Sequence, residues 1–286
     1  MTDRAFQRSL AAATLCGLLL RVLWPEARPV HHDESVNWYF VSGVLRSGWY
    51  DYDPGNYHGP LFFYLSAWAR PIFGDGLWVL RLPTMLLSAA MVPMVWPLRH
   101  RIGPRAASLS GWMLAVSPSL VYFGRDAIHE TTLAAASLGA VVFALRWLDG
   151  RHRHDALWLG LCIGAMVTTK ETFLITGGSW AVGGALAWMV GGRTAWPDRR
   201  TWGWALLGFV LLFVPLYAGF GRHPEGLLEA FQAFFRWGDR GMEGGGHDKV
   251  WWMWPKWLGV SDGVLVLLAV VGLAAAAIRR DPWAVF

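Results

Sequence analysis

The chain has 286 residues, of which 55% are hydrophobic and 16% are charged, with a formal net charge of +5. Soluble globular domains carry about 25% charged residues, so this composition excludes an ordinary soluble domain. Both cysteines, Cys16 and Cys162, lie inside apolar runs, so a disulfide framework is not indicated. The basic residues are scattered between apolar runs and form no continuous stripe, which argues against a nucleic-acid partner.

Long apolar runs predict an all-α, polytopic membrane helical bundle that forms one domain over residues 1–286. A membrane-spanning helix needs about 20 predominantly apolar residues. This criterion gives about eight spans, at residues 9–24, 77–98, 105–123, 129–148, 155–170, 172–190, 201–219 and 259–278. Charge interrupts the run from 156 to 190 only at Lys170 and Glu171, so we expect a hairpin that turns at this pair.

The positions of the arginines predict the orientation of the bundle. They concentrate at the N-terminus and in the segments 99–105, 149–154, 191–200 and 279–286, which the positive-inside rule places in the cytoplasm. We therefore expect a multi-pass protein of the plasma membrane with cytoplasmic termini and outer loops at 25–76, 124–128 and 220–258. The chain stops shortly after its last predicted span, and we expect a C-terminally truncated polypeptide.

Two further helices are expected inside the first outer loop. Apolar residues at helical spacing predict an amphipathic helix over 34–47, with Asp33 as its N-cap and Glu34 in its first turn. Residues 60–73 form a short apolar run, and a span there would place the 99–105 arginines outside. We therefore expect an interfacial or re-entrant helix over 60–73.

The same loop holds the first candidate site residues. Asp33 is a candidate general base or metal ligand, although a capping role alone also explains it. His58 precedes Gly59 and Pro60, and it either contacts substrate or belongs to a plain turn. Tyr57 lies among aromatic and acidic side chains that suit a sugar and equally suit a membrane-interface belt.

The remaining candidates lie in later polar segments. Arg125 is a candidate for binding a phosphate group, and Asp126 is a candidate second carboxylate that faces Asp33 across a shared pocket. The plainer alternative is a surface ion pair between Arg125 and Asp126. Lys170 beside Glu171 suits an anionic lipid phosphate, or Lys170 simply extends to the membrane interface. The glycine-rich, mixed-charge segment 236–249 predicts a flexible outer loop.

Several short motifs, in a fixed order relative to the spans, resemble the GT-C superfamily of membrane glycosyltransferases. They are Asp33-Glu34, His58-Gly59-Pro60-Leu61, Leu80-Arg81-Leu82-Pro83, and Ser117-Pro118 leading to Phe123-Gly124-Arg125-Asp126. The best match is within the protein mannosyltransferase and aminoarabinose transferase-like group, to its flippase-activity-associated family. The resemblance covers residues 20–260 or so.

This resemblance implies a polyprenyl-phosphate-linked sugar donor in the membrane lipid, and transfer outside the cytoplasm to a hydroxyl of a glycan, lipid or protein acceptor. By position, Asp33 matches the catalytic carboxylate, with Glu34 beside it, and Asp126 matches the second-loop acid. Arg125 and Lys170 are candidates for the lipid phosphate. We expect that the reaction requires no cofactor. Binding of a divalent metal such as Mg²⁺ or Mn²⁺ by Asp33 and Asp126 is left open.

Two other classes of protein fit the composition. A lipid flippase or transporter would place its polar residues near the bilayer midplane on broken helices. A scaffold would present an outer loop to a partner without chemistry. Here the polar residues gather at one predicted membrane face, which favours an enzyme.

Overall fold

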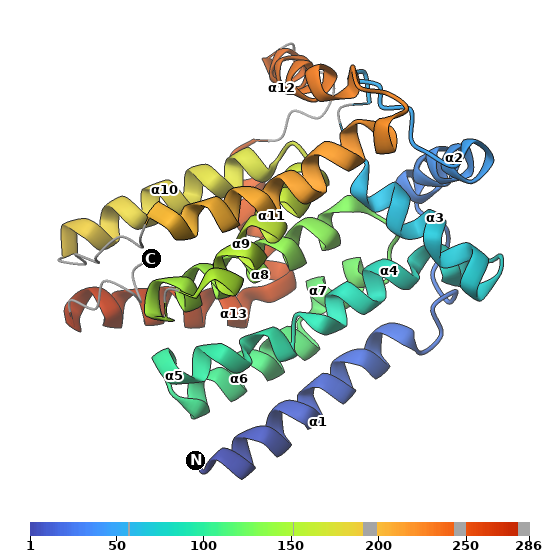
Figure 1. The fold of residues 1–286 in the computed structure, drawn as a ribbon. Coiled ribbons are helices and arrows are strands. Elements are labelled where there is room, and N and C mark those ends of the chain that lie inside the picture. The colour runs from blue at the N-terminus through green and yellow to red at the C-terminus, as the bar shows by residue number, and fades with distance from the viewer. Residues whose placement is uncertain (57, 151, 191–198, 243–249, 280–286) are drawn as a thin grey trace.

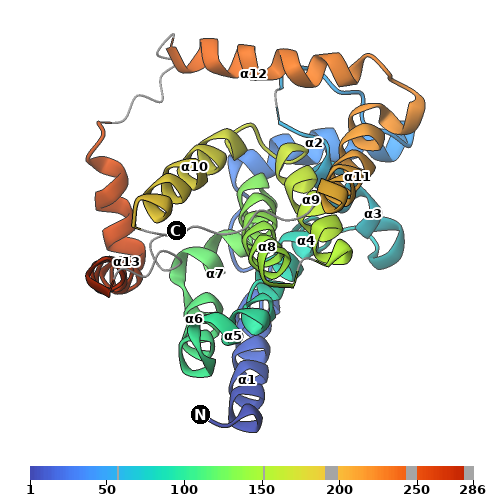
Figure 2. The same ribbon diagram turned by 60° about the vertical axis from the view of Figure 1, so that its left-hand side comes forward.

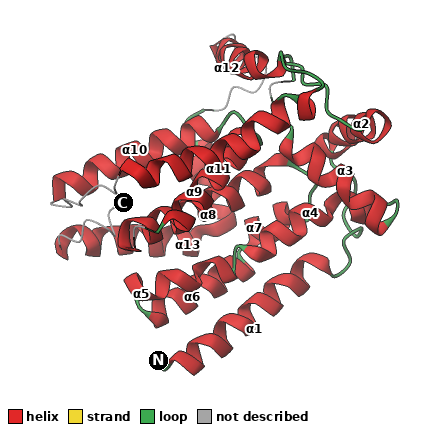
Figure 3. Ribbon diagram, in the orientation of Figure 1, coloured by secondary structure: helices red, strands yellow, loops and turns green. Residues whose placement is uncertain are grey.

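The structure, a computed structural model, describes residues 1–56, 58–150, 152–190, 199–242 and 250–279. In this part of the chain all regular secondary structure is helical, loops connect the helices, and there is no strand (Figure 3). The α-helices are α1 (Asp3–Val22), α2 (His32–Ser47), α3 (Leu61–Phe73), α4 (Leu77–Ala90), α5 (Arg99–Ile102), α6 (Pro104–Val116), α7 (Pro118–Gly124), α8 (His129–Gly150), α9 (Arg153–Val167), α10 (Phe173–Val190), α11 (Arg199–Tyr217), α12 (Gly226–Met242) and α13 (Met253–Arg279). Two short 3₁₀ helices are η1 (Pro93–Leu98) and η2 (Gly219–Gly221).

Helices occupy all eight ranges predicted to span the membrane. Four are long and apolar enough to cross a bilayer: Leu77–Ile102, His129–Gly150, Arg199–Tyr217 and Met253–Ala275. A fifth crossing is formed if α6 and α7, which are bent by 50° at Ser117, count as one broken span. The all-helical membrane architecture is therefore confirmed, while α1, α9 and α10 do not meet the length and apolarity criteria on their own.

The spanning helices run side by side, and α2, α3 and α12 lie at one end of the bundle (Figure 1). Glycines allow α9 and α11 to pack closely against each other. A Cβ atom on Gly160 of α9 would lie 1.9 Å from the carbonyl oxygen of Ala205 on α11, and one on Gly208 would lie 2.2 Å from that of Leu157. Glycine at these contacts lets two membrane helices approach backbone to backbone.

The predicted hairpin and the two helices predicted within residues 25–76 are present. The hairpin turns where predicted, since α9 ends at Val167 and α10 begins at Phe173. A helix covers 61–73, at one end of the bundle. The amphipathic helix exists as α2, but its N-cap is His31 and not Asp33, because Nδ1 of His31 accepts the Asp33 backbone N–H at 3.2 Å.

The segment 236–249 differs from the expected flexible loop over part of its length. Residues 236–242 belong to α12, and residues 243–249 lie outside the described residues. α12 runs across the end of the bundle (Figure 2). It forms because apolar residues recur at helical spacing within it (Leu227, Leu228, Phe231, Phe234 and Phe235), a pattern that outweighs its three glycines.

Candidate functional site

Glu34 and Arg81 form a buried ion pair that fixes the start of α2. The Glu34 carboxylate accepts two hydrogen bonds from the guanidinium of Arg81, both at 2.7 Å, and neither side chain is exposed. It also accepts the backbone N–H groups of Ala127 at 2.9 Å and His31 at 3.0 Å. Burial raises the pKa of Glu34, but these hydrogen bonds outweigh it and hold the pKa below its ordinary value of 4.5.

Arg81 also organises the chain that leaves α1. Its Nη1 donates to the carbonyl of Pro25 at 2.5 Å, and its Nη2 donates to that of Pro29 at 3.3 Å. One guanidinium on α4 therefore holds the 25–29 segment and α2 together. The sequence motif that contains Arg81 did not predict this role. Its position within an apolar run was the available signal, since a charge inside a membrane helix is costly unless it is paired.

The side chain next to Glu34 has the opposite environment. Asp33 is 61% exposed, and its carboxylate lines a small cavity of about 100 Å³. Successive residues of an α-helix point about 100° apart, so α2 directs one carboxylate to Arg81 and the other to the cavity. The lining residues come from four segments of the chain: Asp33, Val36, Asn37, Asn56, His58, Ile128, His129, Glu130 and Lys170.

His58 reaches this cavity because its turn docks on the hairpin between α9 and α10. The backbone N–H groups of Gly59 and Leu61 donate to the carbonyls of Thr169 and Thr168 at 3.1 Å and 2.9 Å. A Cβ atom on Gly59 would lie 2.2 Å from the Thr168 carbonyl, so only glycine permits this approach. The His58 ring is then oriented by Glu171, whose Oε2 lies 2.9 Å from Nδ1.

Lys170 supplies the positive charge of the cavity. Among the described residues that line it, Lys170 is the only lysine or arginine, and its ammonium group pairs with the Glu130 carboxylate. His129 also lines the cavity, and its ring centroid lies 4.8 Å from that of His58. The cavity thus combines two carboxylates, one ammonium group and two imidazoles.

The structure does not bring Asp126 into the lining of this cavity. Its carboxylate is 2% exposed and accepts a 2.6 Å hydrogen bond from Nη1 of Arg28. Burial raises the pKa of the Asp126 carboxyl, and the adjacent Arg28 guanidinium opposes this shift. Arg125, the candidate for a phosphate group, does not line the cavity either, and it donates to the backbone carbonyl of Leu23 at 3.2 Å.

The other candidates are placed as follows. Glu171 is buried behind His58 and does not line the cavity, and Tyr57 lies outside the described residues. Within the described part of the chain, no three His, Cys, Asp or Glu side chains converge in a way that could hold a metal ion.

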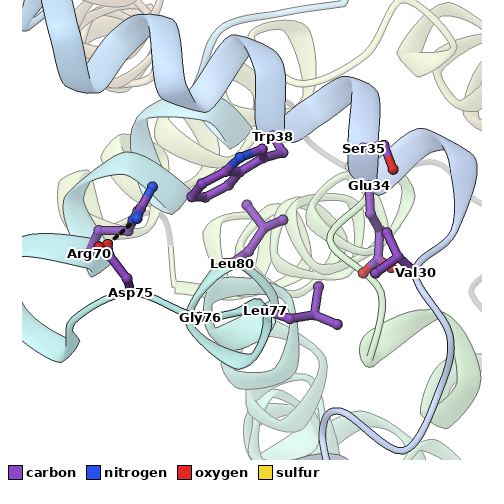
Figure 4. A pocket seen from close by; sticks show the side chains of 9 residues that line it. All are labelled: Val30, Glu34, Ser35, Trp38, Arg70, Asp75, Gly76, Leu77 and Leu80. Atoms are coloured by element: carbon purple, nitrogen blue, oxygen red, sulfur yellow. Dashed lines mark hydrogen bonds and ion pairs between the residues drawn. The ribbon is translucent and has the colours of Figure 1, made fainter.

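A second, larger cavity of about 370 Å³ lies on the other side of α2, between α2, α3 and α4 (Figure 4). Leu77 and Leu80 form its apolar wall. The Arg70 guanidinium lies 4.1 Å from the ring centre of Trp38 and pairs with Asp75. Its third charged side chain, Glu34, pairs with Arg81. Every charged group of this cavity therefore has an ion-pair partner of opposite charge, and the polar cavity at Asp33 is the better candidate for chemistry.

Comparison with known proteins identifies the family. A family profile described as dolichyl-phosphate-mannose-protein mannosyltransferase matches residues 57–218, which is more than half of the chain. The chain belongs to this family of membrane glycosyltransferases of the GT-C type. This confirms the resemblance drawn from the sequence motifs. No curated protein sequence matches the chain.

A solved structure supports the fold. The Saccharomyces cerevisiae protein O-mannosyltransferase Pmt1–Pmt2 complex, bound to the sugar donor, is similar to this chain with a TM-score of 0.54 and 19% sequence identity. The similarity covers 82% of this chain and 35% of that chain. The chain therefore spans about a third of the length of this relative, and the likeness concerns the fold.

Proposed function

We propose that this protein transfers a sugar from a polyprenyl-phosphate donor to an acceptor hydroxyl, with Asp33 as the catalytic base. The observation that carries the proposal is the different placement of the three candidate carboxylates. Glu34 and Asp126 are buried and paired with Arg81 and Arg28, whereas Asp33 is exposed to a cavity that also contains Lys170. Asp33 has no arginine or lysine partner: its ion-pair contact is with the imidazole of His31, whose Nδ1 lies 3.6 Å from Oδ2, and both side chains are exposed. A carboxylate that no buried cation holds is available to accept a proton from a substrate.

In the proposed reaction, the Asp33 carboxylate takes the proton of the acceptor hydroxyl as its oxygen attacks the anomeric carbon. The bond between that carbon and the phosphate oxygen breaks, and its electron pair leaves with the polyprenyl phosphate. The Lys170 ammonium group stabilises the departing phosphate, and His58, oriented by Glu171, contacts the substrate beside it. Glu34, held by Arg81, is a positioning residue for α2. The proposed reaction uses no metal.

The position of the cavity favours an enzyme over a flippase or transporter. Its residues lie in the first two turns of α2, in the connection before α3, at the start of α8 and in the turn between α9 and α10. Transporters instead place such groups near the bilayer midplane, on interrupted helices. The family membership supports the same choice.

A transfer assay tests the proposal. The purified protein receives radiolabelled polyprenyl-phosphate mannose and a serine- and threonine-containing peptide, with and without a chelator. We expect Asp33→Asn to lower transfer by roughly 10²-fold or more, while Asp75→Asn, at an exposed carboxylate of the other cavity, leaves it unchanged. Full transfer by Asp33→Asn would refute the role of Asp33, and loss of transfer with chelator would refute the metal-free reaction.

We further propose that the cavity faces the extracytoplasmic side of the plasma membrane, with both termini in the cytoplasm. Arginine-rich segments at the opposite ends of the spans support this orientation. In a variant whose two cysteines are replaced by alanine, Asp33→Cys and Asp53→Cys should react with an impermeant thiol reagent from outside, and Arg199→Cys only after permeabilisation. The reverse pattern would invert the orientation.

A further inference from the structure

His129 lines the cavity and has an unsatisfied polar atom in its side chain. It is 3% exposed, its side chain lines the cavity, and its Nε2 has no hydrogen-bond partner among the residues that the structure describes. Buried polar groups are almost always hydrogen-bonded, and an unsatisfied one costs about 1–3 kcal/mol. Such an atom in the wall of a ligand cavity indicates a partner that arrives with the ligand.

The ring of His129 is held in place by its neighbours. Its centroid lies 4.6 Å from that of Phe62, 5.0 Å from that of Phe63 and 4.8 Å from that of His58. Because this aromatic packing fixes the ring, a hydrogen bond to a ligand requires little additional loss of side-chain entropy. The free nitrogen is therefore preorganised for binding.

The chemistry of imidazole selects the kind of ligand group. A neutral imidazole has one donor and one acceptor nitrogen, and a sugar hydroxyl can satisfy either because it both donates and accepts. An ionised phosphate oxygen only accepts, and the ammonium group of Lys170 already serves that need. We propose that His129 is a substrate-binding residue that hydrogen-bonds a hydroxyl of the donor sugar, an inference that rests on the proposed glycosyl transfer.

The test compares two lipids that differ only in the sugar. Equilibrium binding of polyprenyl-phosphate mannose and of bare polyprenyl phosphate is measured for the wild type, His129→Leu and His129→Gln. Leucine keeps a similar volume without polar atoms, whereas glutamine places an amide near the Nε2 position. We expect His129→Leu to weaken binding of the mannose lipid about tenfold and to leave the bare phosphate unchanged, while His129→Gln keeps most of the preference.

Thr132→Val is the matched control. Thr132 lies one turn further along α8, is buried, and also has a side-chain oxygen without a partner in the described structure, but it does not line the cavity. Both His129→Leu and Thr132→Val remove an unsatisfied polar group, so neither should lower the thermal unfolding midpoint of the unliganded protein. Only His129→Leu should change sugar binding.

The possible outcomes separate this inference from the proposed function. Three results would overturn the inference and leave glycosyl transfer standing. His129→Leu could weaken the binding of both lipids equally, or it could leave binding of the mannose lipid unchanged. It could also lower the unfolding midpoint without rescue by His129→Gln, which would show a structural role. A wild-type protein that neither prefers the mannose lipid nor transfers mannose would overturn the proposed function and this inference with it.

Discussion

Asp33 and Glu34 are neighbours in the chain, yet their carboxylates have opposite surroundings: Asp33 lines the polar cavity, and Glu34 is enclosed by Arg81 and two backbone N–H groups. One helix turn thus combines an available carboxylate with a structural one. The rigidity of the second fixes the position of the first.

Breaking the buried pair should destabilise the protein strongly. Arg81→Met leaves the Glu34 carboxylate buried without its cation, and removing one partner of a buried pair costs about 3–5 kcal/mol. Arg70→Met is the matched control, because its partner Asp75 is exposed and surface pairs contribute about 0–1 kcal/mol. Thermal unfolding in detergent measures both. Similar midpoints for the two variants would contradict the structural role of Arg81.

Acid should weaken the fold through Glu34. Its native pKa lies below its ordinary value of 4.5, so its stabilising contribution is present above pH 4.5 and is lost as the pH falls through the native pKa. Glu34→Gln removes this titration, so the loss of stability with falling pH should be shallower than in the wild type. Unfolding midpoints measured between pH 7 and pH 3 test the difference. Parallel curves would show that Glu34 titrates normally.

Gly59→Ala should loosen the turn that carries His58. The added Cβ would collide with the Thr168 carbonyl, and overpacking of this kind costs about 1–3 kcal/mol. Gly43→Ala serves as control, since nothing lies within 4 Å of its Cβ and alanine favours a helix interior by about 0.5–1 kcal/mol. We expect opposite shifts of the unfolding midpoint. A shift of the same sign in both variants would argue against the contact.

Lys170 and Glu130 should affect phosphate binding in opposite directions. Lys170→Met removes the cation of the cavity and should weaken bare polyprenyl phosphate about tenfold, whereas Glu130→Gln frees the ammonium group and should tighten it. Both changes should diminish at high salt because charges at this partly exposed site are screened. Binding titrations at two ionic strengths provide the measurement. Weakening by both variants would show that the pair itself holds the cavity together.

The helical architecture could be predicted because bilayer-length apolar runs and helical periodicity are local properties of the sequence. The placement of Asp33 and Glu34 could not, since it depends on Arg81, which follows Glu34 by 47 residues. The same limit applies to Asp126, whose partner is Arg28 and not the adjacent Arg125. His129 was missed because a histidine at the start of an apolar run gives no sign of an unsatisfied nitrogen.

The side chains of α2 hold both backbone groups of Ala127: Glu34 accepts its N–H at 2.9 Å, and Asn37 donates to its carbonyl at 2.8 Å. These two hydrogen bonds fix the position of the connection between α7 and α8, and they also fix the number of residues that it can contain. A single residue inserted between Asp126 and Ile128 would move one of these two groups out of register. Variation in this protein should therefore include substitutions along that connection far more often than insertions or deletions.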